Sequence, residues 1–267
     1  MKHTRHNHYI AYATTAGERL YSILIGPLLI IVVLFAILKL FSFTSWQIKE
    51  VNFSDLFFGV GYTMMRLIIA YFFALIFAVP IALLAVKNTL TEKIFLPMFD
   101  VLESIPILAF FPVLILFFIH IDFPNGAAIF ILFLSMLWNI VFTVVSGLKM
   151  IPRDIVFAAQ VFGIKGWKYF RQVTLPAIFP EIVTGSILAF AQGWNLVIVA
   201  EVLHTYIPAG AHSQDLFGIG SILVSASASG QNNLFVACIS IMVIVIALFN
   251  YLVWQNLIHY SEKFKFE

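Results

Sequence analysis

The stretch YTMMRLIIAYFFALIFAVPIALLAV, from Tyr62 to Val86, contains a single charged side chain, Arg66. A helix needs about 20 predominantly apolar residues to cross the hydrocarbon core of a bilayer. Irregular backbone cannot face lipid, because its N–H and C=O groups would remain without hydrogen-bond partners. The stretch therefore predicts a transmembrane helix.

The composition extends this interpretation to the whole chain of 267 residues, which is 62% hydrophobic and 10% charged. A soluble domain has about 45–50% apolar and about 25% charged residues, so one soluble core cannot bury this excess. We expect an all-α integral membrane protein with about six transmembrane helices. The spans are expected near Leu20–Phe41, Tyr62–Val86, Ile94–Ile119, Ala127–Leu148, Ile182–Leu203 and Leu234–Leu257, the third kinked by Pro106 and Pro112.

The positions of the cations predict the orientation. With these spans, 12 of the 15 Lys and Arg residues fall on the side that holds both termini. Cytoplasmic loops carry an excess of Lys and Arg, so both termini should be cytoplasmic in a bacterial inner membrane. The external segment 204–233 has no Lys or Arg, and Asp215–Ser229 is expected to dip back against the external mouth.

Several other functions find no support in the sequence. The net charge of +2 is too small to indicate nucleic-acid binding, and the single cysteine, Cys238, excludes an internal disulfide or a cysteine-based zinc site. The N-terminal histidines His3, His6 and His8 lie in a polar tail, where we expect no structural metal.

One cytoplasmic segment, KMIPRDIVFAAQVFGIKGWKYFRQVTLPAIFP from Lys149 to Pro180, carries the strongest functional signal. Pro152 suits the first turn of a helix. Gly163 is placed to end that helix, and Gly166 allows a sharp turn before a second short helix. The pattern predicts a helix–turn–helix platform between the fourth and fifth spans. A basic, aromatic segment lying on lipid headgroups is the alternative that composition alone allows.

The spacing in this segment resembles the "EAA" loop of ABC-importer permeases. The matching positions are Ala158, Ala159, Gly163, Phe170, Val173, Leu175, Pro176 and Pro180. Phe157 stands where that family commonly has glutamate. The resemblance implies that the segment is a coupling helix that sits in a groove of a separate ATP-binding subunit, with Phe157 at the same surface.

The resemblance extends over 62–267, which looks like the permease core of the nitrate/sulfonate/taurine group; VIVAEVL and DLFGIG are among its recurring segments. Residues 1–61 would be an N-terminal tail, a first helix and an external linker. The resemblance implies three protein partners: an ATP-binding subunit that holds ATP and Mg, a second permease subunit, identical or different, and an extracytoplasmic substrate-binding protein. The solute would be nitrate, a sulfonate, taurine or a related small compound.

The chain itself lacks the G-x-x-x-x-G-K-[ST] phosphate loop, so we expect no ATP hydrolysis, no enzyme activity and no cofactor bound by this chain. The alternative function is an ion-gradient-driven secondary transporter. Such transporters often contain inverted repeats and broken helices around a site at the bilayer midplane. No convincing internal repeat is visible in the sequence.

Polar residues inside the spans are candidates for the translocation path, because ionisable groups in membranes usually face a protein interior or water. Arg66 and Glu201 both fall toward the external ends of their spans, so they are expected to pair. The candidate path residues are Arg66, Glu103, Ser104, Asn195 and Glu201. Stabilisation of helix packing is the alternative role for each of them.

Overall fold

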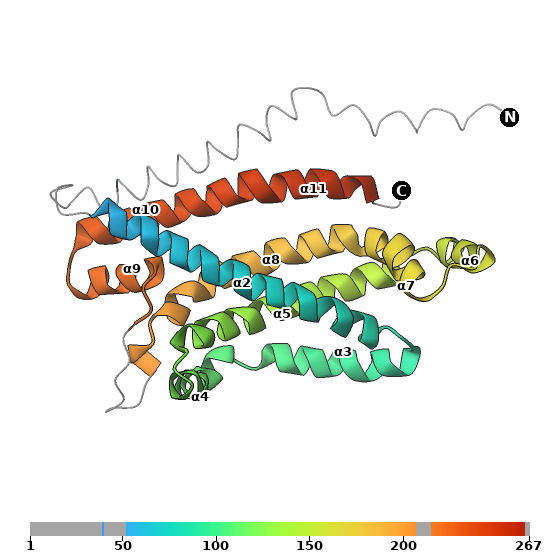
Figure 1. Cartoon of the computed structure of the whole chain (residues 1–267), viewed down its shortest axis with the longest axis horizontal. Coiled ribbons are helices and arrows are strands. Elements are labelled where there is room, and N and C mark those ends of the chain that lie inside the picture. Colours follow the sequence, from blue (N-terminus) through green and yellow to red (C-terminus); the bar gives the residue numbers. More distant parts are fainter. Residues whose placement is uncertain (1–38, 40–51, 207–214, 265–267) are drawn as a thin grey trace, which may run out of the picture.

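The computed structural model describes residue 39 and residues 52–206 and 215–264, and all regular secondary structure in these ranges is helical (Figure 1). The expected first span, Leu20–Phe41, lies outside the described residues except for Lys39, and the N-terminal histidines lie outside them entirely.

Three long helices form the centre of the bundle: α2 (Phe53–Ala85), α5 (Pro124–Met150) and α8 (Leu175–Glu201). Helix α2 begins after Asn52, whose side chain accepts a hydrogen bond from the Ser54 backbone N–H. It is longer than the expected span, and the expected division between residues 61 and 62 falls inside it.

Small side chains allow these helices to pack closely. Helix α2 presents a fully buried stripe at four-residue spacing: Ala70, Ala74, Ala78 and Ala82. Membrane helices associate through close van der Waals contact, which small residues permit. Helix α5 packs along both α2 and α8, and most of the buried apolar cluster of the bundle comes from these three helices.

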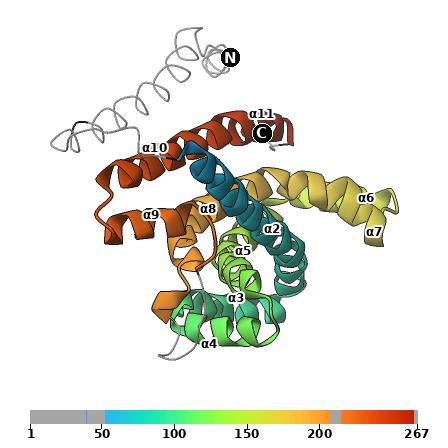
Figure 2. The ribbon, with the colours of Figure 1, turned by 60° about the vertical axis from the view of Figure 1, so that its left-hand side comes forward.

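The remaining helices flank this centre on two sides (Figures 1 and 2). On one side lie α3 (Thr89–Ser104) and α4 (Ile107–His120). On the other, the C-terminal helix continues through α10 (Asn232–Phe249), η4 (Asn250–Trp254), α11 (Gln255–Ser261) and η5 (Glu262–Phe264). The short helix α9 (Ile219–Ala228) precedes it, after η3 (His204–Tyr206).

Four helical segments in the described chain are long and apolar enough to cross a membrane: Phe53–Ala85, Pro124–Met150, Gly166–Glu201 and Asn232–Phe264. The pair α3 and α4 passes the same test together but bends by 77°. These five regions correspond to the second to sixth expected spans. The protein is a multi-pass membrane protein.

The third span differs from the expected kinked helix, because it is broken rather than kinked. Ile105 has extended backbone, with φ −72° and ψ 125°, and α4 starts anew after Pro106. The proline ring disfavours helical backbone at the preceding residue, which explains the position of the break. Pro112, by contrast, lies within α4.

The segment after α5 forms the expected hairpin, made of α6 (Arg153–Val161), α7 (Gly166–Tyr169) and the π-helical turn η2 (Phe170–Thr174). Gly163 has φ +67° and ends α6 in a Schellman motif, in which the Ile164 N–H donates to the Ala159 carbonyl at 2.9 Å. Gly166 also has positive φ, +58°, at the turn.

The second half of the hairpin is not the separate short helix that the sequence predicted. Residues Gly166–Glu201 form one continuous helical segment. Pro176 has no N–H to donate and would crowd the carbonyl four residues earlier. The wider π-helical turn just before it accommodates that defect without ending the helix.

Candidate functional site

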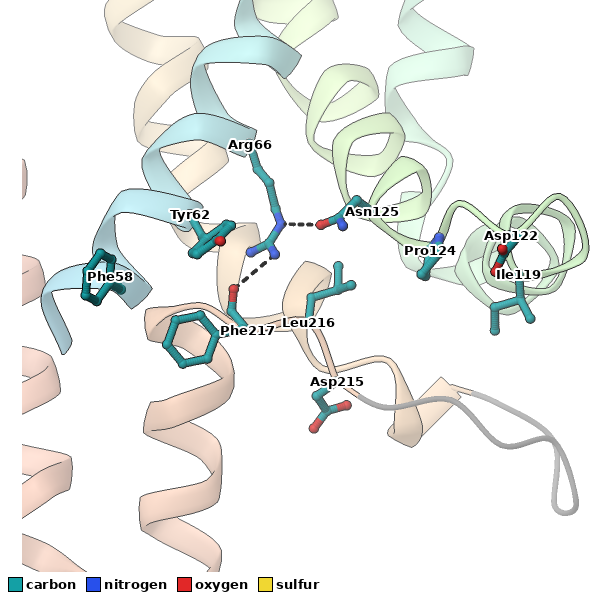
Figure 3. A pocket seen from close by; sticks show the side chains of 10 residues that line it. All are labelled: Phe58, Tyr62, Arg66, Ile119, Asp122, Pro124, Asn125, Asp215, Leu216 and Phe217. Atoms are coloured by element: carbon teal, nitrogen blue, oxygen red, sulfur yellow. Dashed lines mark hydrogen bonds between the residues drawn. The ribbon is translucent and has the colours of Figure 1, made fainter. Parts of the chain in front are cut away.

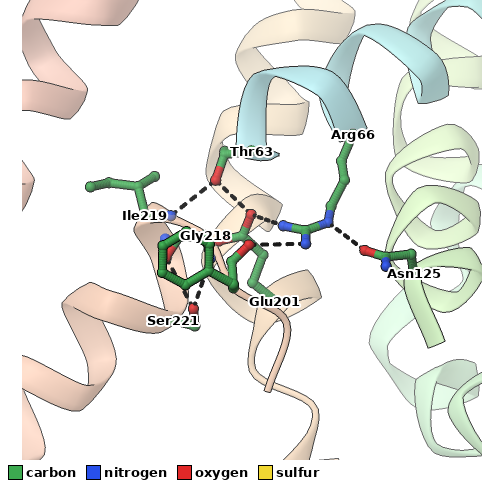
Figure 4. A network of polar contacts seen from close by, with 9 residues as sticks. Thr63, Arg66, Asn125, Glu201, Gly218, Ile219 and Ser221 are labelled. Carbon is green, nitrogen blue, oxygen red and sulfur yellow. Dashed lines mark hydrogen bonds and ion pairs between the residues drawn. The ribbon is translucent and has the colours of Figure 1, made fainter. Parts of the chain in front are cut away.

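A buried ion pair joins α2 to α8 near one end of the bundle (Figure 4). The Arg66 Nη1 atom lies 2.8 Å from Oε1 of Glu201, the last residue of α8. Glu201 is 0% exposed and Arg66 is 5% exposed. The pairing predicted from the sequence is therefore confirmed.

The same carboxylate caps the N-terminus of α9. Glu201 Oε2 accepts a hydrogen bond from the Gly220 backbone N–H at 2.8 Å. Thr63 Oγ1 donates to Glu201 Oε1 at 2.6 Å and accepts from the Ile219 N–H at 3.0 Å. The first N–H groups of a helix lack hydrogen-bond acceptors within that helix and favour a nearby anion. Here Glu201 of α8 and Thr63 of α2 supply the acceptors for α9.

Arg66 extends the network to two further parts of the chain. Its Nε donates to Asn125 Oδ1, at the start of α5, at 2.9 Å, and its Nη2 donates to the Phe217 carbonyl at 3.0 Å. A buried ion pair stabilises a protein only when further hydrogen bonds offset its desolvation. Here those bonds fix α2, α5, α8 and the approach to α9 relative to one another.

Close packing at this network requires glycine. A Cβ atom on Gly218 would overlap the Glu201 carboxylate, and one on Gly220 would crowd both that carboxylate and the backbone of Ile198. The sequence alone did not predict a role for Thr63, Asn125 or these glycines. Two segments that resemble recurring segments of the permease group contain residues of this network. VIVAEVL contains Glu201, and DLFGIG contains both glycines.

A cavity of about 810 Å³ lies beside Arg66, as Figure 3 shows. Aromatic rings line part of it, and the rings of Tyr62 and Phe217 meet edge to face at 5.7 Å. Its lining also includes Asp122 and Asp215. Within the described chain, Arg66 is its only lining Lys or Arg, and this guanidinium is already bound by the network.

The other candidate path residues lie apart from this network. Glu103 and Ser104 are exposed near the end of α3, where the Ser104 hydroxyl donates to the Asp100 carbonyl at 2.7 Å. Asn195 is exposed on α8. Within the described residues, none of these three side chains bonds to the ion pair.

The hairpin lies at the opposite end of the bundle from the ion pair (Figure 1). Its outward surface exposes large apolar side chains beside charged ones such as Lys165 and Lys168. Phe157 is 59% exposed and Trp167 is 73% exposed, and Val161 and Phe162 are more exposed still. Ala158 belongs to this surface. Ala159 does not, because it is only 4% exposed, although the resemblance places it among the residues matched to the coupling segment.

The other residues matched to the coupling segment differ in exposure. Gly163 lies at the exposed turn, and Leu175 is also exposed. Phe170, Val173 and Pro176 are half-buried, and Pro180 is buried within α8. The α6 end of the hairpin is thus open to a partner, whereas its base is anchored in the bundle.

Residues 74–254 match the family of binding-protein-dependent transport system inner membrane components. The chain belongs to this family. It is 29% identical over 198 residues to the nitrate import permease protein NrtB of Leptolyngbya laminosa, covering 74% of this chain and 66% of that protein. Other relatives are the bicarbonate transport system permease protein CmpB of Synechocystis sp., 28% identical over 50% of this chain and 46% of the relative, and the taurine transport system permease protein TauC of Escherichia coli, 23% identical over 53% and 50%.

The matched part therefore spans between 46% and 66% of the length of these relatives. The fold agrees with a chain of the MetNI methionine ABC transporter solved in an inward-facing conformation, with a TM-score of 0.64 at 19% identity. That match covers 79% of this chain and 97% of the other. Family membership identifies a component of a transport system and sets aside the secondary-transporter alternative.

Proposed function

We propose that this chain is the permease subunit of an ATP-driven ABC importer and moves a small solute across the inner membrane by alternating access. The observation that carries the proposal is the hairpin, whose second half continues into α8 and whose free end exposes large apolar side chains. Such side chains gain stability when a partner covers them, because burial removes apolar surface from water.

The partner at the hairpin is a separate ATP-binding subunit, which holds ATP and Mg. Phe157 and Ala158 contact a groove on that subunit, and the rigid base carries its movement into α8. Since Phe157 replaces the usual glutamate of the family's loop, this contact is apolar rather than charged. A second permease subunit, membrane lipid and an extracytoplasmic substrate-binding protein complete the assembly.

The proposed orientation places both termini and 149–180 in the cytoplasm. The cation distribution supports it. The ion-pair network then lies at the external end, where the binding protein delivers solute. The relatives named for nitrate, bicarbonate and taurine transport suggest a small compound of this kind as the solute.

Reconstitution tests the function. Vesicles that contain this chain, its ATPase and its binding protein should take up nitrate, bicarbonate or taurine only when ATP is supplied to the ATPase. Uptake by this chain alone, driven by an ion gradient, would contradict the proposal.

Cysteine labelling tests the orientation. In a Cys238→Ser background, Lys165→Cys should resist a membrane-impermeant thiol reagent in intact cells and react after the membrane is opened. Rapid reaction in intact cells would reverse the topology.

A further inference from the structure

Helix α8 carries an outward stripe that differs from the exposed face of α2. The stripe consists of four exposed residues: Thr184, Leu188, Gln192 and Asn195. Their spacing of four, four and three places them on one face of the helix. The stripe is mixed and polar, whereas the exposed face of α2 is made of large apolar and aromatic side chains such as Phe72 and Phe73.

The two amides of this stripe lack hydrogen-bond partners in the described chain. Helix α8 contains four hydroxyl and amide side chains. Thr184 donates to the Pro180 carbonyl at 3.0 Å, and Ser186 donates to the Ile182 carbonyl at 2.6 Å, so both hydroxyls are satisfied within their own helix. Gln192 and Asn195 have no such bond to any described residue.

Neither amide lies at the end of α8. Asn195 and Gln192 precede Glu201, at the end of α8, by six and nine residues, which corresponds to about 9 Å and about 14 Å along the axis. Asparagine and glutamine side chains are too short to cover this distance. An amide in lipid without a partner is unfavourable, so this face must meet water or polar groups of another molecule.

We propose that Gln192 and Asn195 line the aqueous solute path and hydrogen-bond the passing solute. This inference rests on the proposed importer function and identifies the side chains that act in it. Their NH₂ groups donate to oxygen atoms of the solute, and their carbonyl oxygens accept from its N–H or O–H groups. A nitrate, bicarbonate or sulfonate group offers such oxygens.

The chemistry of the stripe suits passage rather than retention. Its four residues carry no charge, and the nearby cation, Arg66, is bound by Glu201. Conduction requires binding that is strong enough for entry and weak enough for exit. Neutral amides provide weak contacts to an anion without holding it, so charge selection falls to the binding protein.

The test measures water access to the stripe in the assembled complex. In a Cys238→Ser background, Gln192→Cys and Asn195→Cys are reacted with the water-soluble sulfonate reagent MTSES. Phe72→Cys is the matched control. Phe72 follows Arg66 by six residues, as Asn195 precedes Glu201 by six, so the ion pair places both at the same depth.

Both stripe positions should react at least about tenfold faster than the control at Phe72, because the reagent attacks the thiolate and a thiol in lipid stays protonated. Slow reaction at both stripe positions would overturn the inference. Disulfide formation between two copies of the chain at these positions, without reaction with MTSES, would also overturn it, because that result indicates a subunit contact from which water is excluded.

A second measurement separates this inference from the proposed function. When the ATPase is trapped with ATP and vanadate, the reaction rates at 192 and 195 should change while the rate at 72 stays constant. Fast reaction that does not respond to the nucleotide supports the water-lined face and counts against ATP-driven gating. The two ideas can therefore fail independently.

Discussion

Removal of the buried carboxylate should destabilise this protein far more than removal of an exposed one. Glu201→Leu leaves the Arg66 guanidinium buried without its anion and removes the acceptor of the Gly220 N–H and the Thr63 hydroxyl. Breaking a buried pair by removing one partner costs about 3–5 kcal/mol, mostly because a charge remains buried and unpaired.

The second substitution should restore part of this loss. In Arg66→Met/Glu201→Leu no charge remains unpaired, so the penalty for the buried cation disappears. The α9 N–H group and the Thr63 hydroxyl still lack their acceptor, which leaves a deficit of about 1–3 kcal/mol. Arg66→Met alone should also cost about 3–5 kcal/mol, because it leaves the Glu201 carboxylate buried without its cation. The losses of the two single variants together should therefore exceed that of the double variant by at least about 3 kcal/mol, which is the coupling energy of the double-mutant cycle.

The measurement is unfolding of the purified chain in mixed micelles titrated with sodium dodecyl sulfate, followed by tryptophan fluorescence. The matched control is the ion pair between Glu92 and Lys149, whose side chains are 28% and 45% exposed. An exposed pair contributes about 0–1 kcal/mol. The reasoning is refuted if the coupling energy between positions 66 and 201 is no larger than that between positions 92 and 149.

Five further substitutions test local geometry and coupling. Gly218→Ala should destabilise the protein, because the added methyl overlaps the buried carboxylate, whereas Gly61→Ala faces open space and should stabilise α2 by about 0.5–1 kcal/mol in the same unfolding assay. Gly163→Ala should lower the stability of the hairpin by about 1 kcal/mol, because alanine is unfavourable at the positive φ of this position, and it should weaken ATPase co-purification. Phe157→Glu should reduce ATPase co-purification without altering stability, while Ala159→Glu should unfold the hairpin, which limited proteolysis would detect; equal proteolysis of the two would contradict the burial of Ala159.

Much of the bundle could be predicted from the sequence, because lipid imposes a simple rule. A span must be long, apolar and helical, so hydropathy alone located α2, α5, α8 and the C-terminal helix. The hairpin was predictable for a different local reason. Gly163 can adopt positive φ at little cost, and the helix ends there.

Interactions between distant segments could not be predicted in the same way. Thr63 and Gly220 are far apart in the chain, and neither has a property that marks it as a partner of Glu201. The pairing of Arg66 with Glu201 was accessible only because both are charged and both fall near the same end of their spans. Neutral groups give no such signal, so the capping of α9 required the structure.

The burial of Ala159 illustrates the same limit within a single motif. Ala158 and Ala159 are adjacent and chemically identical, so the sequence offers no reason to treat them differently. Successive residues on a helix point about 100° apart, so two adjacent alanines can differ in burial, and only the packing of α6 decides which one is covered. The fold turns Ala159 inward and leaves Phe157 and Ala158 outside. A surface proposed to meet the ATPase must therefore be built from Phe157, Ala158 and the exposed apolar residues that follow them on the hairpin.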